Sequence, residues 1–166
     1  METDETCTES MKGTEAQHEH RWLQQLAGDW SFQGEAKMDP AKPADKFEGI
    51  ESVRALGQLW IIAEGQGEMC GGSARTVMTL GFNPQSRRFV GTFIASMMAH
   101  LWIYNGQLDG NSLTLDTEGP DHTGKMLKFR DVIELQSAHR RTLTSHTLGD
   151  DGEWRKFMEA TYLRRN

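Results

Sequence analysis

From residue 29 onward, the sequence alternates between short segments in which hydrophobic residues recur at every second position and turns of a few polar residues. The clearest pair of segments spans 74–82 and 88–97, with the turn Asn83-Pro84-Gln85-Ser86 between them. Asn-Pro favours a turn because Pro84 restricts φ and the Asn83 side chain can bond to the backbone that follows. A long series of such hairpins predicts an antiparallel meander that closes into a barrel with an interior cavity.

We expect ten strands, over residues 30–38, 46–56, 59–69, 74–82, 88–97, 100–108, 112–118, 125–136, 140–148 and 153–164. The turns between them are well marked. Asp109-Gly110-Asn111 and Asp150-Asp151-Gly152 favour tight hairpins because glycine adopts positive φ readily. With 166 residues, the chain suits one all-β domain with a sizeable core.

The N-terminal segment has a different composition. Residues 1–13 are polar and charged, so we expect a disordered acidic tail, followed by a barrel domain over residues 14–166. Residues 1–20 carry six acids and one base, which accounts for most of the net charge of −6. The rest of the chain is nearly neutral, which argues against nucleic acid or an anionic membrane as a partner.

One short helix is expected at about residues 15–27, before the first strand. Thr14 and Gln17 fit a capping box, and Gly28 would end the helix. Three large apolar residues recur at helical spacing: Trp22, Leu23 and Leu26. A short amphipathic helix in front of a meander is expected to plug one mouth of the barrel.

The chain has no apolar run of 18 residues, so no membrane-spanning helix is expected. The N-terminus is acidic where a signal peptide would be basic and then apolar, so we expect a cytoplasmic protein. Cys7 and Cys70 lie in the tail and in an expected turn, and we expect both to be free thiols. A homo-oligomer stays open, but no feature of the sequence supports one.

Several motifs resemble a bacterial family known as domain of unknown function 1579, in the lipocalin-like (calycin) barrel group. The matching segments are Thr79–Asn83, Phe89–Ile94, Ser96-Met97, Gly119–Asp121, Thr123–Lys125, Arg130–Val132, Asp151-Gly152 and Met158–Tyr162. The resemblance implies a lipocalin-like fold but no activity. The sequence departs from the family pattern at Phe93, where tryptophan is usual, and at Ala95, where aspartate is usual.

The tripeptide Gly28-Asp29-Trp30 extends the resemblance to the first strand. In lipocalin-like barrels this motif places the tryptophan across the closed end, and an arginine of a late strand stacks on it. Arg164 is the best-placed partner in this sequence. The interaction would be structural, because tryptophan covers a large apolar area and arginine can lie on its face.

Polar and aromatic residues share several strand faces, which suggests a site for a small apolar or amphipathic molecule in the barrel cavity. The expected ligand-binding residues are Trp60, Glu64, Phe93, Met97, His100, Trp102, Tyr104, Arg130 and Glu159. Arg130 would be the polar anchor for an anionic head group, since arginine binds carboxylates in a bidentate manner. An alternative is that Arg130 forms a structural ion pair with Glu159 or Glu64, or that it lies exposed on the outer face.

Two other functions stay open. The first is an enzyme that uses the same cavity with His100 or Glu64 as a general acid/base, although the sequence identifies no catalytic residue and does not favour catalysis. The second is an interaction protein whose barrel is filled by side chains. The six histidines form no metal-binding motif, so we expect no metal and no cofactor. His146 is the one histidine considered as a haem ligand.

Overall fold

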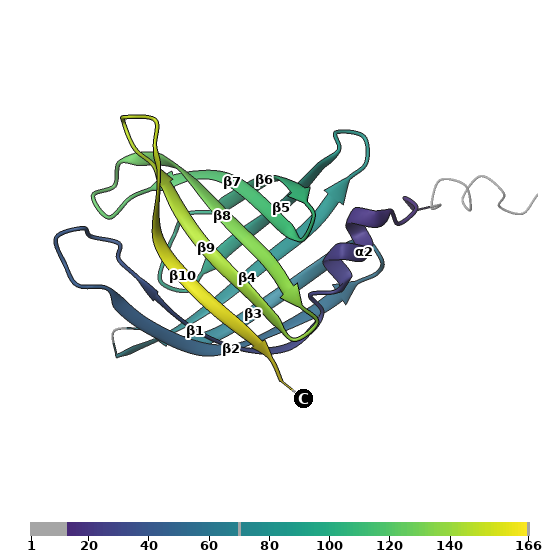
Figure 1. The fold of residues 1–166 in the computed structure, drawn as a ribbon, viewed down its shortest axis with the longest axis horizontal. Coiled ribbons are helices and arrows are strands. Elements are labelled where there is room, and N and C mark those ends of the chain that lie inside the picture. The colour runs from purple at the N-terminus through teal and green to yellow at the C-terminus, as the bar shows by residue number, and fades with distance from the viewer. Residues whose placement is uncertain (1–12, 70, 166) are drawn as a thin grey trace, which may run out of the picture.

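The computed structural model describes residues 13–69 and 71–165, which form a closed ten-stranded barrel with a short helix at one end (Figure 1). The expected tail, residues 1–13, lies outside the described residues except for Gly13. The described part of the chain contains no helix that is long and apolar enough to cross a membrane.

The ten strands confirm the expected all-β meander, and every strand bound lies within two residues of its predicted position. The elements in chain order are α2 His18–Gln24, β1 Gly28–Ala36, β2 Asp45–Leu56, β3 Trp60–Met69, β4 Gly72–Asn83, β5 Arg88–Ala95, β6 Trp102–Asp109, β7 Ser112–Pro120, β8 Met126–Ser137, β9 Arg140–Leu148 and β10 Trp154–Arg164. Each strand pairs antiparallel with its sequence neighbours, and β1 also pairs with β10, which closes the ring.

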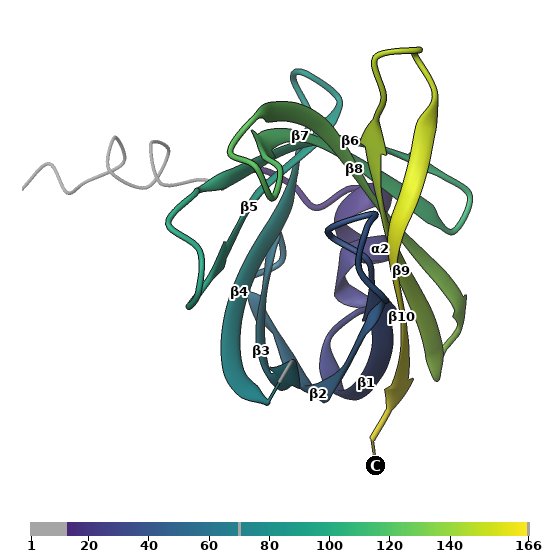
Figure 2. The ribbon, with the colours of Figure 1, turned by 90° about the vertical axis from the view of Figure 1, so that its left-hand side faces the viewer.

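Helix α2 lies across one end of the ring, and the loops β1–β2 and β9–β10 extend from the other end (Figures 1 and 2). We call these the closed end and the open end. The helix is shorter than the expected 15–27, and its N-cap is Gln17 rather than Thr14. The capping box forms between Gln17 and His20, so the histidine takes the role that the sequence analysis gave to a glutamine.

His20 also joins the helix to the barrel. Its Nδ1 accepts a hydrogen bond from the Gln17 backbone N–H at 2.9 Å, so Nε2 carries the proton and donates to the Phe82 carbonyl at 2.9 Å. Both nitrogens of this buried ring are therefore satisfied, which favours one position of the helix over the end of β4.

The expected stacking of Arg164 on Trp30 is present at the closed end. Trp30 is fully buried, and the guanidinium carbon of Arg164 lies 4.3 Å from its ring centroid. Most of the core gathers around this contact and beneath the helix: Trp22, Leu23, Leu26, Trp30, Val53, Ile61, Leu80, Phe82, Phe89, Leu113, Leu115, Ile133 and Leu135. The closed end is thus a packed hydrophobic layer, and any accessible interior lies nearer the open end.

Candidate ligand site inside the barrel

Asp131 is the central polar residue of the barrel interior. It lies on β8 between Phe129 and Ile133, on the face that is buried inside the ring. Tyr104 Oη donates a hydrogen bond of 2.5 Å to Asp131 Oδ2, and Ser145 Oγ donates one of 2.6 Å to Oδ1. Three neighbouring regions of the wall, on β6, β8 and β9, therefore converge on one carboxylate.

The environment of Asp131 alters two pKa values. Burial raises the pKa of the Asp131 carboxyl, and the hydrogen bonds from Ser145 and Tyr104 offset part of that rise. Burial also raises the pKa of Tyr104 well above its usual value, and the nearby Asp131 carboxyl raises it further. Tyr104 is therefore a neutral donor at physiological pH, and Asp131 acts as the acceptor for two neutral hydroxyl groups.

Asp131 borders an internal space. Protein surrounds the carboxyl closely enough for burial to dominate its pKa, yet the residue keeps an intermediate solvent exposure. Other inward-facing residues around the ring have the same intermediate exposure: Phe32, Thr76, Met78, Phe93 and Leu143. Because these residues and Asp131 lie on five different strands of the inner wall, the middle of the barrel is not completely filled by side chains.

A second charged group lies beside this space, towards the closed end. Arg141 on β9 forms an ion pair with Glu51 on β2, and their side chains are only 5% and 13% exposed. The Arg141 guanidinium also stacks on Tyr162, 3.9 Å from the ring centroid, and on Trp30 at 4.7 Å. Burial raises the pKa of Tyr162, followed by the charge of Glu51, so this phenol is also neutral. Glu51 and Arg141 cancel each other's charge.

Aromatic side chains form the wall between the polar groups and the open end. The Trp102 and Phe129 rings pack edge to face with centroids 5.0 Å apart, and Phe157 packs on the other side of Phe129 at 5.9 Å. A Cβ atom at position 119 would collide with the Trp102 ring, so Gly119 is required for that ring to lie against β7. The site thus combines an aromatic wall with a polar base.

Two polar atoms of this wall lack a partner among the described residues. They are Trp102 Nε1 and Thr117 Oγ1, and both are buried. A buried polar group without a hydrogen bond typically costs about 1–3 kcal/mol. Most buried polar groups in proteins have a protein or water partner, so each of these two atoms would gain from one. No group of three or more metal-ligating side chains occurs within residues 13–69 and 71–165.

Three of the residues expected from the sequence do face the interior: Phe93, Trp102 and Tyr104. His100 lies at the open rim, where its ring packs edge to face on Trp102 and its Nε2 lies 2.8 Å from the Glu118 carbonyl oxygen. The structure brings these four residues together on β5, on β6 and just before β6.

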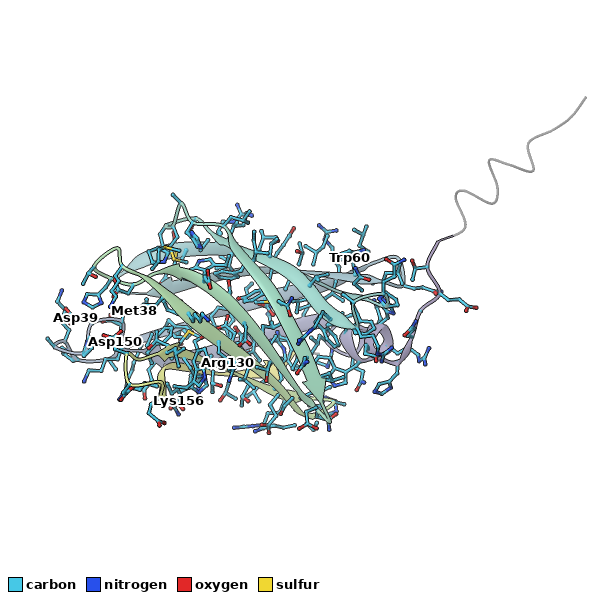
Figure 3. All side chains as sticks on the ribbon, turned by 90° about the horizontal axis from the view of Figure 1, so that it is seen from above. Met38, Asp39, Trp60, Arg130, Asp150 and Lys156 are labelled. Carbon is cyan, nitrogen blue, oxygen red and sulfur yellow. The ribbon has the colours of Figure 1, made fainter. Side chains whose placement is uncertain are left out.

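Arg130 does not face the interior, so its expected role as the polar anchor is wrong, and so is the alternative of an ion pair with Glu159 or Glu64. Arg130 lies on the outer face of β8 (Figure 3), where it forms a bidentate pair with Asp116 at 2.7 and 3.2 Å. Its guanidinium also stacks on Trp154, 4.2 Å from the ring centroid. The hydrogen bonds that Arg130 donates to the Asp116 carboxylate raise the pKa of Arg130. Since residues alternate along a strand, the inward position belongs to its neighbour, Asp131.

Four further residues expected at the site lie away from the interior. Trp60 is on the outer face near the helix (Figure 3) and covers Gly81. Glu64 pairs with Arg54 at 3.3 Å, and Glu159 pairs with Lys156 at 2.6 Å, both on the outer face. Met97 lies in the loop after β5 and is 59% exposed. His146, the histidine considered for haem, also points outward, with its Nδ1 3.4 Å from the Arg130 carbonyl oxygen.

The sequence analysis overlooked Asp131, Ser145, Glu51 and Arg141. A signal for Asp131 was present, because it is the one polar residue on an otherwise apolar face. On β8 that face reads Leu127, Phe129, Asp131, Ile133 and Leu135. A single carboxylate in such a pattern is a better candidate for an interior group than a charge on a mixed face such as that of Arg130.

Two grooves on the outer surface are possible alternatives to the interior site. One, of about 700 Å³, crosses β1, β2, β9 and β10 and is lined mainly by acids and threonines, including Glu35, Glu48 and Thr144. The other, of about 670 Å³, lies over β6–β8 beside Arg130 and Ile103. Neither groove contains Asp131, Tyr104 or Ser145.

Comparison with solved structures supports the fold. The S-type phycobiliprotein lyase CPES from Guillardia theta is 12% identical, with a TM-score of 0.60 over 88% of this chain and 92% of that chain. Rv2717c from M. tuberculosis is 11% identical, with a TM-score of 0.61 over 92% and 100%. EF1p2_mFAP2b, which was solved bound to DFHBI, is 14% identical, with a TM-score of 0.50 over 89% and 99%. At these identities the likeness concerns the fold alone.

No curated protein matches the chain in sequence. The family model described as "Protein of unknown function (DUF1579)" matches residues 15–164, which include the helix and all ten strands. The family resemblance noted in the sequence therefore extends over both halves of the barrel, and the chain belongs to the DUF1579 family.

Proposed function

We propose that the protein binds a small, partly apolar molecule non-covalently inside the barrel, with the polar part of the molecule at Asp131 and the apolar part between the aromatic walls. The observation that carries this proposal is the environment of Asp131. The barrel encloses its carboxyl, and Tyr104 and Ser145 hold it by hydrogen bonds, yet it stays accessible to an internal space. Apolar pockets with a few fixed polar groups are typical of small-molecule sites.

The architecture supports the same proposal. The closed end is packed, so a ligand would enter from the open end, where Phe93 and Trp102 face inward. EF1p2_mFAP2b, a barrel of similar fold, binds DFHBI. The cytoplasmic location expected from the N-terminal composition stays a prediction.

Calorimetric titration with octanol tests the proposal. Octanol has an apolar chain and one hydroxyl, so it should bind at a 1:1 ratio with the hydroxyl near Asp131. Thr76→Phe adds bulk to the inner wall of β4 and should weaken octanol binding at least tenfold. Val77→Phe adds the same side chain to the outer face of the same strand and should leave the affinity unchanged.

Two outcomes would refute binding in the barrel. No binding of octanol to the wild-type chain would favour the filled-barrel alternative. Equal weakening by Thr76→Phe and Val77→Phe, in variants as stable as the wild type, would show that octanol binds outside the barrel. Thermal unfolding of both variants, measured without ligand, checks that neither substitution weakens binding by destabilising the barrel.

A further inference from the structure

The charges inside the barrel do not balance. The charged side chains that the described residues place inside the barrel are Glu51, Arg141 and Asp131, and Arg164 covers the closed end. Glu51 and Arg141 form an ion pair, and Arg164 donates all its hydrogen bonds to backbone carbonyls at the closed end. Asp131 is the remaining charge, and no lysine or arginine of the described chain pairs with it.

Asp131 retains unused capacity to accept hydrogen bonds. An ionised carboxylate has about four acceptor sites, and Tyr104 and Ser145 occupy one on each oxygen. Because both donors are neutral hydroxyl groups, they satisfy hydrogen bonds without neutralising charge. A buried carboxylate with no counter-ion is costly unless it takes up a proton or meets a cation. The side of Asp131 that is accessible from within the barrel is where such a cation would bind.

The aromatic wall favours the same kind of ligand. Cations are attracted to the faces of aromatic rings, most strongly to tryptophan. This barrel already stacks two guanidinium groups on rings, Arg141 on Tyr162 and Arg164 on Trp30. Trp102, Phe93 and Phe129 provide further rings between Asp131 and the open end.

From the unpaired carboxylate and the aromatic wall together, we propose that the ligand class is an amphipathic amine, whose ammonium group pairs with Asp131 and whose apolar part packs against Trp102 and Phe93. This inference rests on the proposed function and narrows it. It also reverses the charge expected from the sequence, where Arg130 suggested an anionic head group. The reversal follows from which neighbour on β8 faces inward, since Arg130 is already paired with Asp116 outside.

The test compares three ligands with the same chain length and different charge: octylamine, octanol and octanoate. Each is titrated calorimetrically at neutral pH and low salt into the wild-type chain. Octylamine should bind at least tenfold more tightly than octanol, and octanoate should bind more weakly than both. This ranking needs no variant, so it does not depend on the folding of a mutant.

Two variants then test whether Asp131 causes the preference for octylamine. Asp131→Asn keeps the shape and an acceptor oxygen but removes the charge, so octylamine should lose its advantage over octanol. Arg130→Met removes a charge from the adjacent outward position and should leave the ranking unchanged. If Asp131→Asn fails to fold, Tyr104→Phe gives a second test, because it retains the carboxylate and should retain the preference for octylamine.

The outcomes separate the two proposals. If octanol does not bind, the proposed function fails and this inference fails with it. If octanol binds but octylamine binds no more tightly than octanol, only this inference is refuted. The same holds if octanoate binds as tightly as octylamine. This inference is likewise refuted if the preference for octylamine persists in Asp131→Asn or disappears in Arg130→Met.

Discussion

The guanidinium of Arg164 lies over the buried ring of Trp30, with its central carbon 4.3 Å from the ring centroid. The same guanidinium donates hydrogen bonds to the carbonyls of Gln25, Ala27 and Ala138. Gly28 leaves room for it, because a Cβ atom at this position would collide with the Arg164 Nη1 atom. The last strand is thereby fastened to the end of the helix and to the β8–β9 turn.

Trp30→Ala is expected to lower the free energy of unfolding by about 3–5 kcal/mol, the usual range for removing a large aromatic side chain from a core. Arg164→Ala should cost less, and the two losses should not add, because each substitution removes the same stacking contact. A double-mutant cycle measured by urea unfolding checks this. Strictly additive losses would mean that the stacking contributes nothing to stability.

The Glu51–Arg141 pair gives a second stability prediction. Arg141→Met alone leaves a buried carboxylate without its partner and should destabilise the barrel by about 3–5 kcal/mol. Adding Glu51→Gln removes the unpaired charge, so the double variant should recover part of the loss. Urea unfolding of the single and double variants measures the recovery. A double variant less stable than Arg141→Met would contradict this account of the pair.

A substitution of His20 tests how helix α2 is attached to the barrel. His20→Ala removes the hydrogen bonds to the Gln17 amide and the Phe82 carbonyl, and the expected loss is about 1–3 kcal/mol. Hydrogen exchange should show reduced protection in α2. His18→Ala is the matched control, because His18 is an exposed histidine on the same helix. If both variants exchange like the wild type, His20 does not fasten the helix.

The raised pKa of Asp131 predicts a particular pH dependence of stability. The groups that influence this carboxyl are Ser145 and His146 of β9 and Tyr104 of β6, and burial outweighs them. Between the unfolded-state pKa, about 4, and the higher folded-state value, the unfolded chain ionises while the folded protein keeps its proton. The contribution of Asp131 to stability is therefore greatest at low pH and falls as the pH rises through this window.

Asp131→Asn removes this dependence. The stability of the variant relative to the wild type should increase with pH, by about 1.4 kcal/mol for each pH unit in which only the unfolded state is ionised. Urea unfolding between pH 4 and pH 8 measures the difference without added ligand. A difference that stays constant across this range, or that falls with pH, would show that the folded state does not disfavour the charged carboxylate.

The order of the strands and their bounds could be predicted from the sequence, whereas most of the site could not. Strand bounds follow from local signals, such as the glycines of the β6–β7 and β9–β10 turns. The face of a strand that points inward depends on its partners. The face of β8 that carries Arg130 mixes charged and apolar residues, so its pattern does not say whether it points inward. Arg130 was therefore expected inside the barrel, whereas its neighbour Asp131 lies there.

Contacts between side chains across the barrel are harder to predict from the sequence. Arg141 and Glu51 are 90 positions apart, and their contact depends on the stagger of strands around the ring. By contrast, the Trp30–Arg164 contact was predictable because the resemblance places both residues in a known arrangement. Tyr104 and Trp102 were also identified, since two aromatic residues two positions apart on one strand must share a face.

The central claim is that the interior next to Asp131 is the ligand site. The most direct measurement is a crystal structure of the protein soaked with octylamine that carries bromine at the end of its chain. The account predicts an anomalous bromine peak inside the barrel, among Phe93, Trp102 and Phe129, with the amine nitrogen within hydrogen-bond distance of Asp131. A peak in an outer groove, such as the one beside Ile103, would contradict it, and so would an interior without ligand at saturating concentration.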